Sequence, residues 1–285
     1  MIRLVATDLD GTLLRSDNTV SDRTRAALQA AAAAGLLVVF VTGRPPRWLD
    51  DVVDETGHVG VAVGANGAVI YDMASERIIT AHTLPETLLH DLTMQLRGAF
   101  PSVGFAVEFG HTFAAEPGYT HDWDVNPETD RRGNPIAPPH IGTVDEIVTA
   151  PAVKLLAKDR EADADEFLAA ATELVGDRAT ITHSSSFGLL ELSAPGVTKA
   201  TGLAEVAATH GIDASEVVAI GDMPNDVPML RWAGRSYAVA NAHPAAVEAA
   251  DETVGANDDD AVAVLIESLL TPPGDQHDGS PGFRG

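Results

Sequence analysis

The sequence predicts an α/β fold, in which a Rossmann-like core with a parallel sheet is interrupted by an inserted α+β domain. At both ends of the chain, short apolar runs alternate with helix-like segments, a pattern typical of a parallel sheet joined by right-handed crossovers. Between residues 83 and 188 this alternation gives way to hairpin-like strands. Polar residues also follow the predicted core strands at their carboxyl ends, where open α/β sheets bind ligands.

The first part of the core is predicted over residues 1–82. Its first strand, Leu4–Thr7, is an apolar run that stops at an acid. Residues 21–35 are predicted as a helix, because the segment is rich in alanine and Ser21 suits its N-cap position. Residues 36–41 are continuously apolar, which favours a strand covered on both faces. A strand at 61–63 and a hairpin at 69–71 and 78–80 complete this part.

The inserted domain is predicted over residues 83–188. Its helices are expected at 85–100 and 161–175, and its strands at 103–109, 112–115, 153–157, 179–183 and 188–192. The stretch 116–142 is rich in proline and lacks periodicity, so it is expected to be a long loop. Within it, Trp123, Arg131 and Arg132 either close over a ligand or belong to a surface loop that contacts nothing.

The core is predicted to resume over residues 189–271. Helices are expected at 198–210, 225–232, 244–250 and 259–270, with strands at 217–220 and 236–239. The last residues, 272–285, are rich in proline, glycine and polar side chains, and this composition predicts a disordered tail.

Composition and charge exclude several classes of function. The 285 residues carry a net charge of −24, which argues against binding to nucleic acid or to an anionic membrane surface. No cysteine is present, so disulfides, thiolate zinc sites and cysteine nucleophiles are ruled out. No signal-like segment and no apolar stretch of the roughly 18–20 residues needed to cross a bilayer is present. We therefore expect a cytoplasmic protein, and the sequence leaves its oligomeric state open.

Polar residues that are far apart in sequence follow the predicted parallel strands. They are Asp8 and Asp10 after the first strand, Thr42, Gly43 and Arg44 after the second, Asn66 after the third, Asp222, Asn225 and Asp226 after the fourth, and Lys199 at the start of a helix. Carboxylates gathered in this way need a hard cation, and oxygen ligands without His or Cys favour Mg²⁺. The lysine, hydroxyl and amide groups suit phosphate oxygens. Together they predict phosphoryl transfer.

Four motifs, DLDGT, VTGR, GVTK and GDMPND, resemble those of the haloacid dehalogenase-like (HAD) superfamily. Their spacing is similar to that of its Cof-type branch, in which a large α/β cap domain is inserted between the second and third motifs. The resemblance covers about residues 1–82 and 189–270 through motifs, and the cap through size and position.

The resemblance implies a role for each matching residue. Asp8 would be the nucleophile that forms an aspartyl-phosphate. Asp10 would be the general acid and base. The metal ligands would be Asp8, Asp222 and the backbone carbonyl of Asp10, and Asp226 would support the site. The substrate-binding residues would be Thr42, Gly43, Arg44, Lys199 and Asn225, with Thr42 and Lys199 holding the transferred phosphoryl group.

The implied function is that of a Mg²⁺-dependent phosphatase acting on small phosphomonoesters, such as sugar phosphates or phosphorylated cofactors. Two alternatives stay open, a phosphomutase on the same scaffold and a non-catalytic protein that binds a phosphorylated metabolite. Three side chains also have simpler interpretations. Arg44 could instead pair with a surface acid, Asn66 could only fill a left-handed turn position, and Glu191 could only cap a strand edge.

Overall fold

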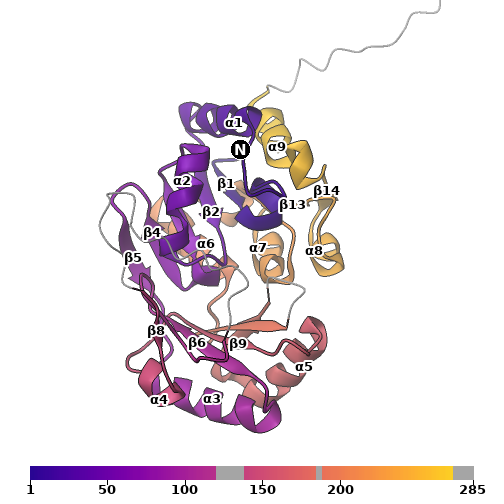
Figure 1. Ribbon diagram of the computed structural model, residues 1–285. Coiled ribbons are helices and arrows are strands. Elements are labelled where there is room, and N and C mark those ends of the chain that lie inside the picture. Colours follow the sequence, from indigo (N-terminus) through magenta and orange to yellow (C-terminus); the bar gives the residue numbers. More distant parts are fainter. Residues whose placement is uncertain (120–137, 184–187, 272–285) are drawn as a thin grey trace, which may run out of the picture.

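Two sheets organise the chain, one in each half of the molecule as Figure 1 shows it. The computed structural model describes residues 1–119, 138–183 and 188–271. The predicted tail, 272–285, and the side chains of Trp123, Arg131 and Arg132 lie outside the described residues. The fold class predicted from the sequence, a Rossmann-like core with an inserted α+β domain, is confirmed.

The core sheet has eight strands in the order β14-β13-β12-β1-β2-β3-β4-β5. These strands are β1 (Leu4–Thr7), β2 (Leu37–Val41), β3 (Val61–Gly64), β4 (Val69–Asp72), β5 (Arg77–Ala81), β12 (Val217–Gly221), β13 (Arg235–Ala238) and β14 (Glu252–Thr253). Neighbours are parallel from β14 to β3, whereas β4 and β5 pair antiparallel. In register, Val5 of β1 lies between Val38 of β2 and Val218 of β12. The strands β2 and β3 lie on one side of β1, and the later strands β12, β13 and β14 lie on the other. The direction of the crossovers therefore reverses beside β1, and an open α/β sheet forms a ligand-binding crevice at such a point.

Helices cover both faces of the core sheet. They are α1 (Asp22–Ala33), α2 (Asp50–Thr56), α6 (Lys199–Thr209), α7 (Val227–Trp232), α8 (Pro244–Ala249) and α9 (Ala261–Leu270). One apolar cluster joins α1, α2 and α9 to one face, and another joins α6, α7 and α8 to the other. The helix α1 starts where the sequence predicts, because Ser21 accepts a hydrogen bond from the Thr24 amide and so caps it.

The second sheet belongs to the inserted domain, called the cap from here on. Its strand order is β10-β11-β9-β6-β7-β8. The strands are β6 (Gly104–Glu108), β7 (Phe113–Ala115), β8 (His140–Ile141), β9 (Lys154–Lys158), β10 (Thr180–Thr182) and β11 (Leu189–Ser193). The helices α3 (Glu86–Ala99), α4 (Val144–Ile147) and α5 (Ala164–Val175) lie on the side of this sheet away from the core (Figure 1). The opposite face of the sheet is therefore turned toward the core.

The strand β11 differs in its placement from the predicted division of the chain. A strand at 188–192 is expected among those of the inserted domain, although the predicted boundary gives residues 189–271 to the core, and β11 pairs with β9 and β10 in the cap sheet. The apolar pattern of residues 189–193 indicates a strand without indicating which sheet it joins. We propose that the cap extends from about residue 83 to Ser193.

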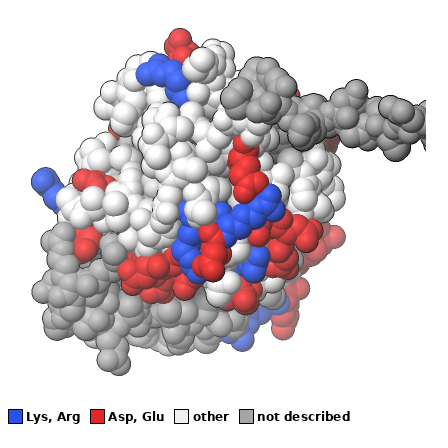
Figure 2. Space-filling model, turned by 90° about the horizontal axis from the view of Figure 1, so that it is seen from above, with Lys and Arg blue, Asp and Glu red and all other residues white. Residues whose placement is uncertain are grey.

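The helices and the surface charges of the described residues bear on possible contact with membranes and other polyanions. None of the helices among the described residues is long and apolar enough to cross a membrane. On the face seen in Figure 2, most described Lys and Arg side chains adjoin Asp or Glu side chains instead of forming one broad basic field. Ion pairs tie α1 and its preceding loop to the C-terminal part of the core, such as Arg23 with Glu267 and Arg15 with Asp260.

Candidate active site

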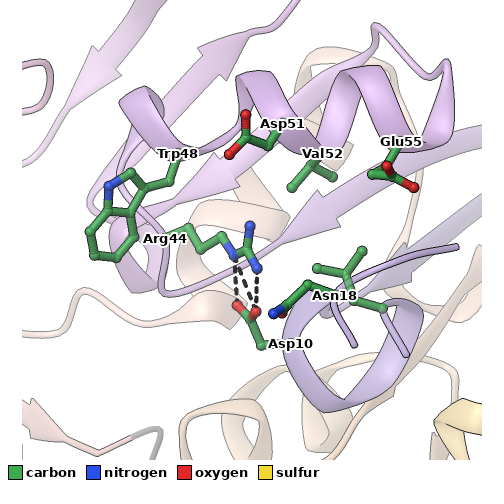
Figure 3. Close-up of a pocket in the computed structure, with 8 residues that line it drawn as sticks. Asp10, Asn18, Arg44, Trp48, Asp51, Val52 and Glu55 are labelled. Carbon is green, nitrogen blue, oxygen red and sulfur yellow. Dashed lines mark hydrogen bonds and ion pairs between the residues drawn. The ribbon is translucent and has the colours of Figure 1, made fainter. Parts of the chain in front are cut away.

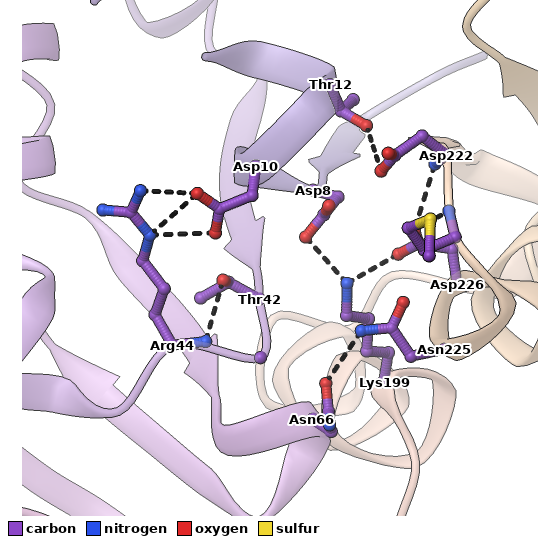
Figure 4. A network of polar contacts seen from close by, with 12 residues as sticks. Asp8, Asp10, Thr12, Thr42, Arg44, Asn66, Lys199, Asp222, Asn225 and Asp226 are labelled. Atoms are coloured by element: carbon purple, nitrogen blue, oxygen red, sulfur yellow. Dashed lines mark hydrogen bonds and ion pairs between the residues drawn. The ribbon is translucent and has the colours of Figure 1, made fainter. Parts of the chain in front are cut away.

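The predicted site residues converge at the carboxyl edge of the core sheet (Figure 4). Asp8 follows β1 directly, and its backbone amide donates to the carbonyl of Ile220 in β12 at 3.0 Å. Thr42 follows β2, and its amide donates to Val63 of β3 at 2.8 Å. These ladder contacts fix the strand ends side by side, so residues distant in sequence share one small volume.

Lys199 lies at the centre of this volume as the first residue of α6. Its side chain is 1% exposed, and its Nζ donates to Oδ1 of Asp8 and to Oδ1 of Asp226, each at 2.7 Å. Burial alone would lower the pKa of Lys199, but the charges of Asp226 and Asp8 outweigh it and hold this pKa above its ordinary value. Lys199 is therefore a fixed cation beside Asp8.

Three acids of the site could hold a metal ion. Asp8, Asp222 and Asp226 each offer a carboxylate oxygen, and these atoms lie within 4.8 Å of one another. Asp226 is already occupied, because Oδ1 accepts from Lys199 and Oδ2 accepts from the amides of Asp222, at 3.0 Å, and Met223, at 2.9 Å. Asp8 and Asp222 are thus the acids with capacity left for an ion, and the Asp10 side chain is not in this group.

The electrostatics of these acids also favour a cation. Burial raises the pKa of Asp8, and the charges of Asp226 and Asp222 raise it further, although Lys199 opposes them. Burial, followed by the charge of Asp226, raises the pKa of Asp222 to about 7. A divalent ion between the two carboxylates would remove the cost of holding them ionised.

Gly11 is required by the local geometry next to Asp222. Its φ of +73° lies in the left-handed region, and a Cβ there would come within 2.4 Å of Asp222 Oδ2. Thr12 then donates from its hydroxyl to Asp222 Oδ1 at 3.0 Å. The DLDGT motif therefore positions Asp222 as well as supplying Asp8.

Asp10 and Arg44 form an ion pair that the sequence analysis did not foresee (Figure 3). The Arg44 Nε lies 2.9 Å from Asp10 Oδ2, and its terminal nitrogen also donates to Oδ1, so the contact is bidentate. Arg44 thus pairs with an acid of the site itself. A pocket lies beside this pair, and it is lined by Trp48, which precedes α2, and by Asp51, Val52 and Glu55 of α2.

A cavity lies between the carboxyl edge of the core sheet and the inner face of the cap. Its core side includes Asp8, Asp10, Gly43, Arg44, Trp48 and Asn225, and its cap side includes Glu108, Tyr119, Lys154, Leu156, Lys158, Leu189 and Glu191. Thr42, Lys199 and Asp226 are buried beneath it. A ligand in this cavity would be held between the two domains, as is common for enzymes that bind substrate at a domain interface.

Two cap residues and one core residue join the site in ways that the sequence analysis missed or left open. Lys154 of β9 is 3% exposed, and its Nζ donates to the Gly43 carbonyl at 2.8 Å and pairs with Glu191. Glu191 accepts from Asn66, so it does more than cap a strand edge. Asn66 has a φ of 58°, so it fills a left-handed turn position, and its side chain also accepts a hydrogen bond from Asn225. A lysine within the apolar run VKLLA was the signal for Lys154.

A parallel sheet with clustered acids at its carboxyl edge and a second domain above them defines a two-domain α/β enzyme. The chain belongs to the haloacid dehalogenase-like hydrolases, whose family model matches residues 5–266. This confirms the family predicted from the four motifs.

Known relatives agree with this assignment over nearly the whole chain. The 5-amino-6-(5-phospho-D-ribitylamino)uracil phosphatase YwtE of Bacillus subtilis is 28% identical over 287 residues, covering 95% of this chain and 99% of that protein. YitU of the same organism, with the same named activity, is 26% identical over 278 residues, covering 94% and 97%. A solved haloacid dehalogenase-like hydrolase from B. subtilis superposes with a TM-score of 0.80 at 26% identity, covering 94% of this chain and 100% of that one. The chain is accordingly a phosphatase of this superfamily.

Proposed function

We propose that this protein is a Mg²⁺-dependent phosphatase that hydrolyses small phosphomonoesters through an aspartyl-phosphate formed on Asp8. The observation that supports this most directly is the environment of the Asp8 carboxylate. One of its oxygens is held by Lys199 at 2.7 Å, Asp222 lies within ion-sharing distance, and the residue lines the cavity between core and cap. A carboxylate held in this way is a nucleophile with a fixed direction of attack.

The donor set of the site fits magnesium. The ligand atoms available are carboxylate oxygens of Asp8 and Asp222, with Asp226 behind them, and His and Cys are absent from the cluster. Hard oxygen ligands of this kind favour Mg²⁺ over softer metals. When bound, the ion would neutralise charge on the carboxylates and on the phosphoryl oxygens.

The first chemical step transfers the phosphoryl group to Asp8. A carboxylate oxygen of Asp8 forms a bond to phosphorus while the bond from phosphorus to the ester oxygen breaks. Asp10 gives its proton to that departing oxygen, which leaves as an alcohol. To carry that proton, the Asp10 carboxyl must leave the bidentate contact with Arg44, because a neutral carboxyl cannot serve as the anion of that pair.

The second step returns Asp8 to its starting state. Asp10, now ionised, accepts a proton from a water molecule, and the water oxygen bonds to phosphorus as the bond to Asp8 breaks. Inorganic phosphate leaves, and the consumed water balances the alcohol and phosphate formed. Throughout, Lys199 and the Thr42 hydroxyl would stabilise negative charge on the transferred group.

The relatives and the cavity support a proposal for the substrate class. YwtE and YitU are named for a phosphomonoester that carries a ribityl chain and a uracil ring. The cavity of this chain likewise lies between two domains and has both charged and apolar walls, with Leu156 and Leu189 from the cap. We therefore place its substrate among phosphorylated sugars, polyols and cofactor precursors of similar size.

The decisive experiment is a screen of phosphorylated metabolites in which released phosphate is measured, with Mg²⁺ and with excess EDTA. We expect phosphate release that depends on Mg²⁺ and disappears in Asp8→Asn. A phosphomutase would give an isomerised sugar phosphate with little free phosphate. A non-catalytic protein would bind a phosphorylated metabolite without changing it, and either result would overturn the proposal.

A further inference from the structure

A chain of buried polar groups runs from the cap into the phosphate-binding edge of the core. In the cap, Lys154 of β9 pairs with Glu191 of β11. From there Glu191 Oε2 accepts from Asn66 Nδ2 at 3.1 Å, and Asn66 Oδ1 accepts from Asn225 Nδ2 at 3.1 Å. Lys154 also donates to the carbonyl of Gly43 at 2.8 Å. The two cap residues are thereby bonded directly to the core loops that contain Gly43 and Asn66, and through Asn66 to the loop that contains Asn225.

In this series of buried polar groups, the donor and the acceptor of each hydrogen bond are fixed. The ionised carboxylate of Glu191 accepts hydrogen bonds and cannot donate them. Asn66 must therefore turn its Nδ2 toward Glu191, which leaves Oδ1 facing Asn225. Asn225 must in turn offer Nδ2, because two amide oxygens facing each other would repel. The charge of Glu191 thus determines the orientation of an amide two links away.

The orientation of Asn225 matters because this residue lines the cavity together with Asp8. Its Oδ1 is buried and has no hydrogen-bond partner among residues 1–119, 138–183 and 188–271. Turning the amide over would exchange this oxygen for an N–H and change what the cavity wall offers a ligand. Gly43 belongs to the same wall, and a Cβ at Gly43 would come within 3.1 Å of Asn66 Oδ1, so the chain is closely packed against the loop that follows β2.

The ion pair between Lys154 and Glu191, at the cap end of this series of hydrogen bonds, contributes more to specificity of structure than to stability. The side chains of Lys154 and Glu191 are 3% and 6% exposed, and a buried pair gains little net free energy over apolar groups of similar size. Its contacts with Gly43 and Asn66, however, exist only when the cap is docked on the core. Lifting the cap would remove both contacts at once.

We propose that Lys154 and Glu191 are positioning residues, through which docking of the cap sets the orientation of Asn225 and of the Gly43 peptide beside Asp8. This inference rests on the proposed phosphatase function, because its effect is on the step at Asp8. The two cap residues act through Gly43, Asn66 and Asn225, and they hold these groups where the transferred phosphoryl group would lie.

The first test is the double variant Lys154→Met/Glu191→Leu. It replaces both partners with apolar groups of similar length, so it removes the polar chain without leaving a buried charge unpaired. We expect kcat to fall about 10–100-fold, as for a misplaced catalytic site, while KM changes less than about threefold. Inhibition by orthovanadate, which mimics the transition state, should weaken more than inhibition by phosphate.

The second test removes the middle link of the polar chain and leaves the buried ion pair intact. Asn66→Gly is compatible with the φ of 58° at this position, and it removes the oxygen that accepts from Asn225, so the Asn225 amide is no longer held in one orientation. We expect a similar loss of kcat with little change in KM, and this variant serves if the double variant does not fold. The matched control is Arg97→Met, which breaks the ion pair between Arg97 of α3 and Glu116. The helix α3 lies on the side of the cap sheet away from the core (Figure 1), so this control should leave kcat unchanged.

The outcomes separate this inference from the proposed function. If the native protein is a phosphatase but Lys154→Met/Glu191→Leu and Asn66→Gly both keep its kcat, the positioning role is wrong. If the native protein releases no phosphate, the proposed function fails, and the ¹⁵N side-chain amide resonances of Asn225 decide the matter. Asn225 resonances that move in the double variant, or in Asn66→Gly if the double variant does not fold, and not in Arg97→Met would support the positioning chain, and resonances that stay in place would overturn it.

Discussion

The two sheets of the molecule place their polar residues in different positions. In the core sheet, the strands β1, β2 and β12 are buried except for Leu37 at the start of β2, and polar residues such as Asp8 and Asp222 follow at the strand ends. In the cap sheet, Lys154 and Glu191 lie within the strands, on the face turned toward the core. A parallel sheet covered on both faces has room for charge only at its edges, whereas an antiparallel sheet can carry polar groups on one face.

This difference suggests a division of labour in the enzyme. The strand ends of the core are fixed by neighbouring strands, so they suit groups that must meet the reacting atoms with little tolerance. The inner face of the cap belongs to a separate domain, so it suits groups whose contact with the site depends on docking of that domain. Substitutions at the core edge should therefore cost more than those on the cap face.

The largest effect is expected for Asp8→Asn. An amide cannot act as the nucleophile, so phosphate release should fall about 10⁵–10⁶-fold, as in other enzymes that lose their nucleophile. Rates are measured with saturating substrate and Mg²⁺, and thermal unfolding serves to check that the variant is folded. A variant that keeps more than about a hundredth of the native rate would rule out the covalent intermediate on Asp8. It would also contradict the expectation that substitutions at the core edge cost more activity than those on the cap face.

Asp10→Asn should come next. Loss of general acid and base catalysis costs about 10²–10⁴-fold in kcat, and Arg44 retains a hydrogen bond to the amide oxygen, so the local structure should persist. A substrate with a good leaving group, such as 4-nitrophenyl phosphate, needs less help from an acid, so its first step should suffer less than that of an alkyl phosphate. Equal losses for the two substrates in single-turnover experiments would argue against a proton from Asp10.

Thr42→Val should have a smaller effect. The Thr42 hydroxyl accepts from the Arg44 amide at 3.0 Å, which leaves its proton free to be donated to a phosphoryl oxygen. Loss of one hydrogen bond to a charged group should lower kcat/KM about tenfold or somewhat more. Steady-state kinetics measure this effect, and an unchanged kcat/KM would remove Thr42 from the site.

The sequence predicted the core edge well because the signals there are local or lie in motifs. The N-cap of α1 at Ser21 depends on residues within one turn, and the acids after β1 and β12 follow from the rule that parallel strands share a carboxyl edge. These rules do not predict which side chains contact one another. The Asp10–Arg44 pair joins residues 34 apart, and strand ends alone give no side-chain direction.

The cap was less predictable for a physical reason. Lys154 and its partner Glu191 are 37 residues apart. Glu191 is the one charge in β11, and Lys154 is separated by apolar residues from Lys158 at the other end of β9. Such a charge is buried only if its partner arrives on the neighbouring strand, and register between β9 and β11 is a property of the folded sheet. The same limit explains why the predicted boundary at residue 188 divides the strand expected at 188–192 from the rest of the cap, since the pattern of residues 189–193 is equally suitable for either sheet.

The smallest predicted effect concerns stability, and it tests whether the metal ion binds to the acids of the core. Without an ion, burial raises the pKa of Asp222 from an ordinary value of 3.8 to about 7. The folded protein then holds a proton that the unfolded chain has released, so its stability falls as pH rises through this window. Mg²⁺ must displace that proton at pH 6 but not at pH 8, and one pH unit of competition corresponds to about 1.4 kcal/mol.

The stabilisation by Mg²⁺ should therefore be greater at pH 8 than at pH 6, by about 3 °C in Tm for a chain of this size. Thermal unfolding at both pH values, with and without Mg²⁺ at constant ionic strength, measures the difference. In Asp222→Asn the pH dependence of the Mg²⁺ effect should weaken, because only Asp8 then keeps a raised pKa. In the cap variant Lys154→Met/Glu191→Leu it should persist in full, because neither cap residue belongs to the acid cluster. A Mg²⁺ effect lost in the cap variant and kept in Asp222→Asn would mean that the ion binds to the cap face, and the division between a catalytic edge and a docking face would be wrong.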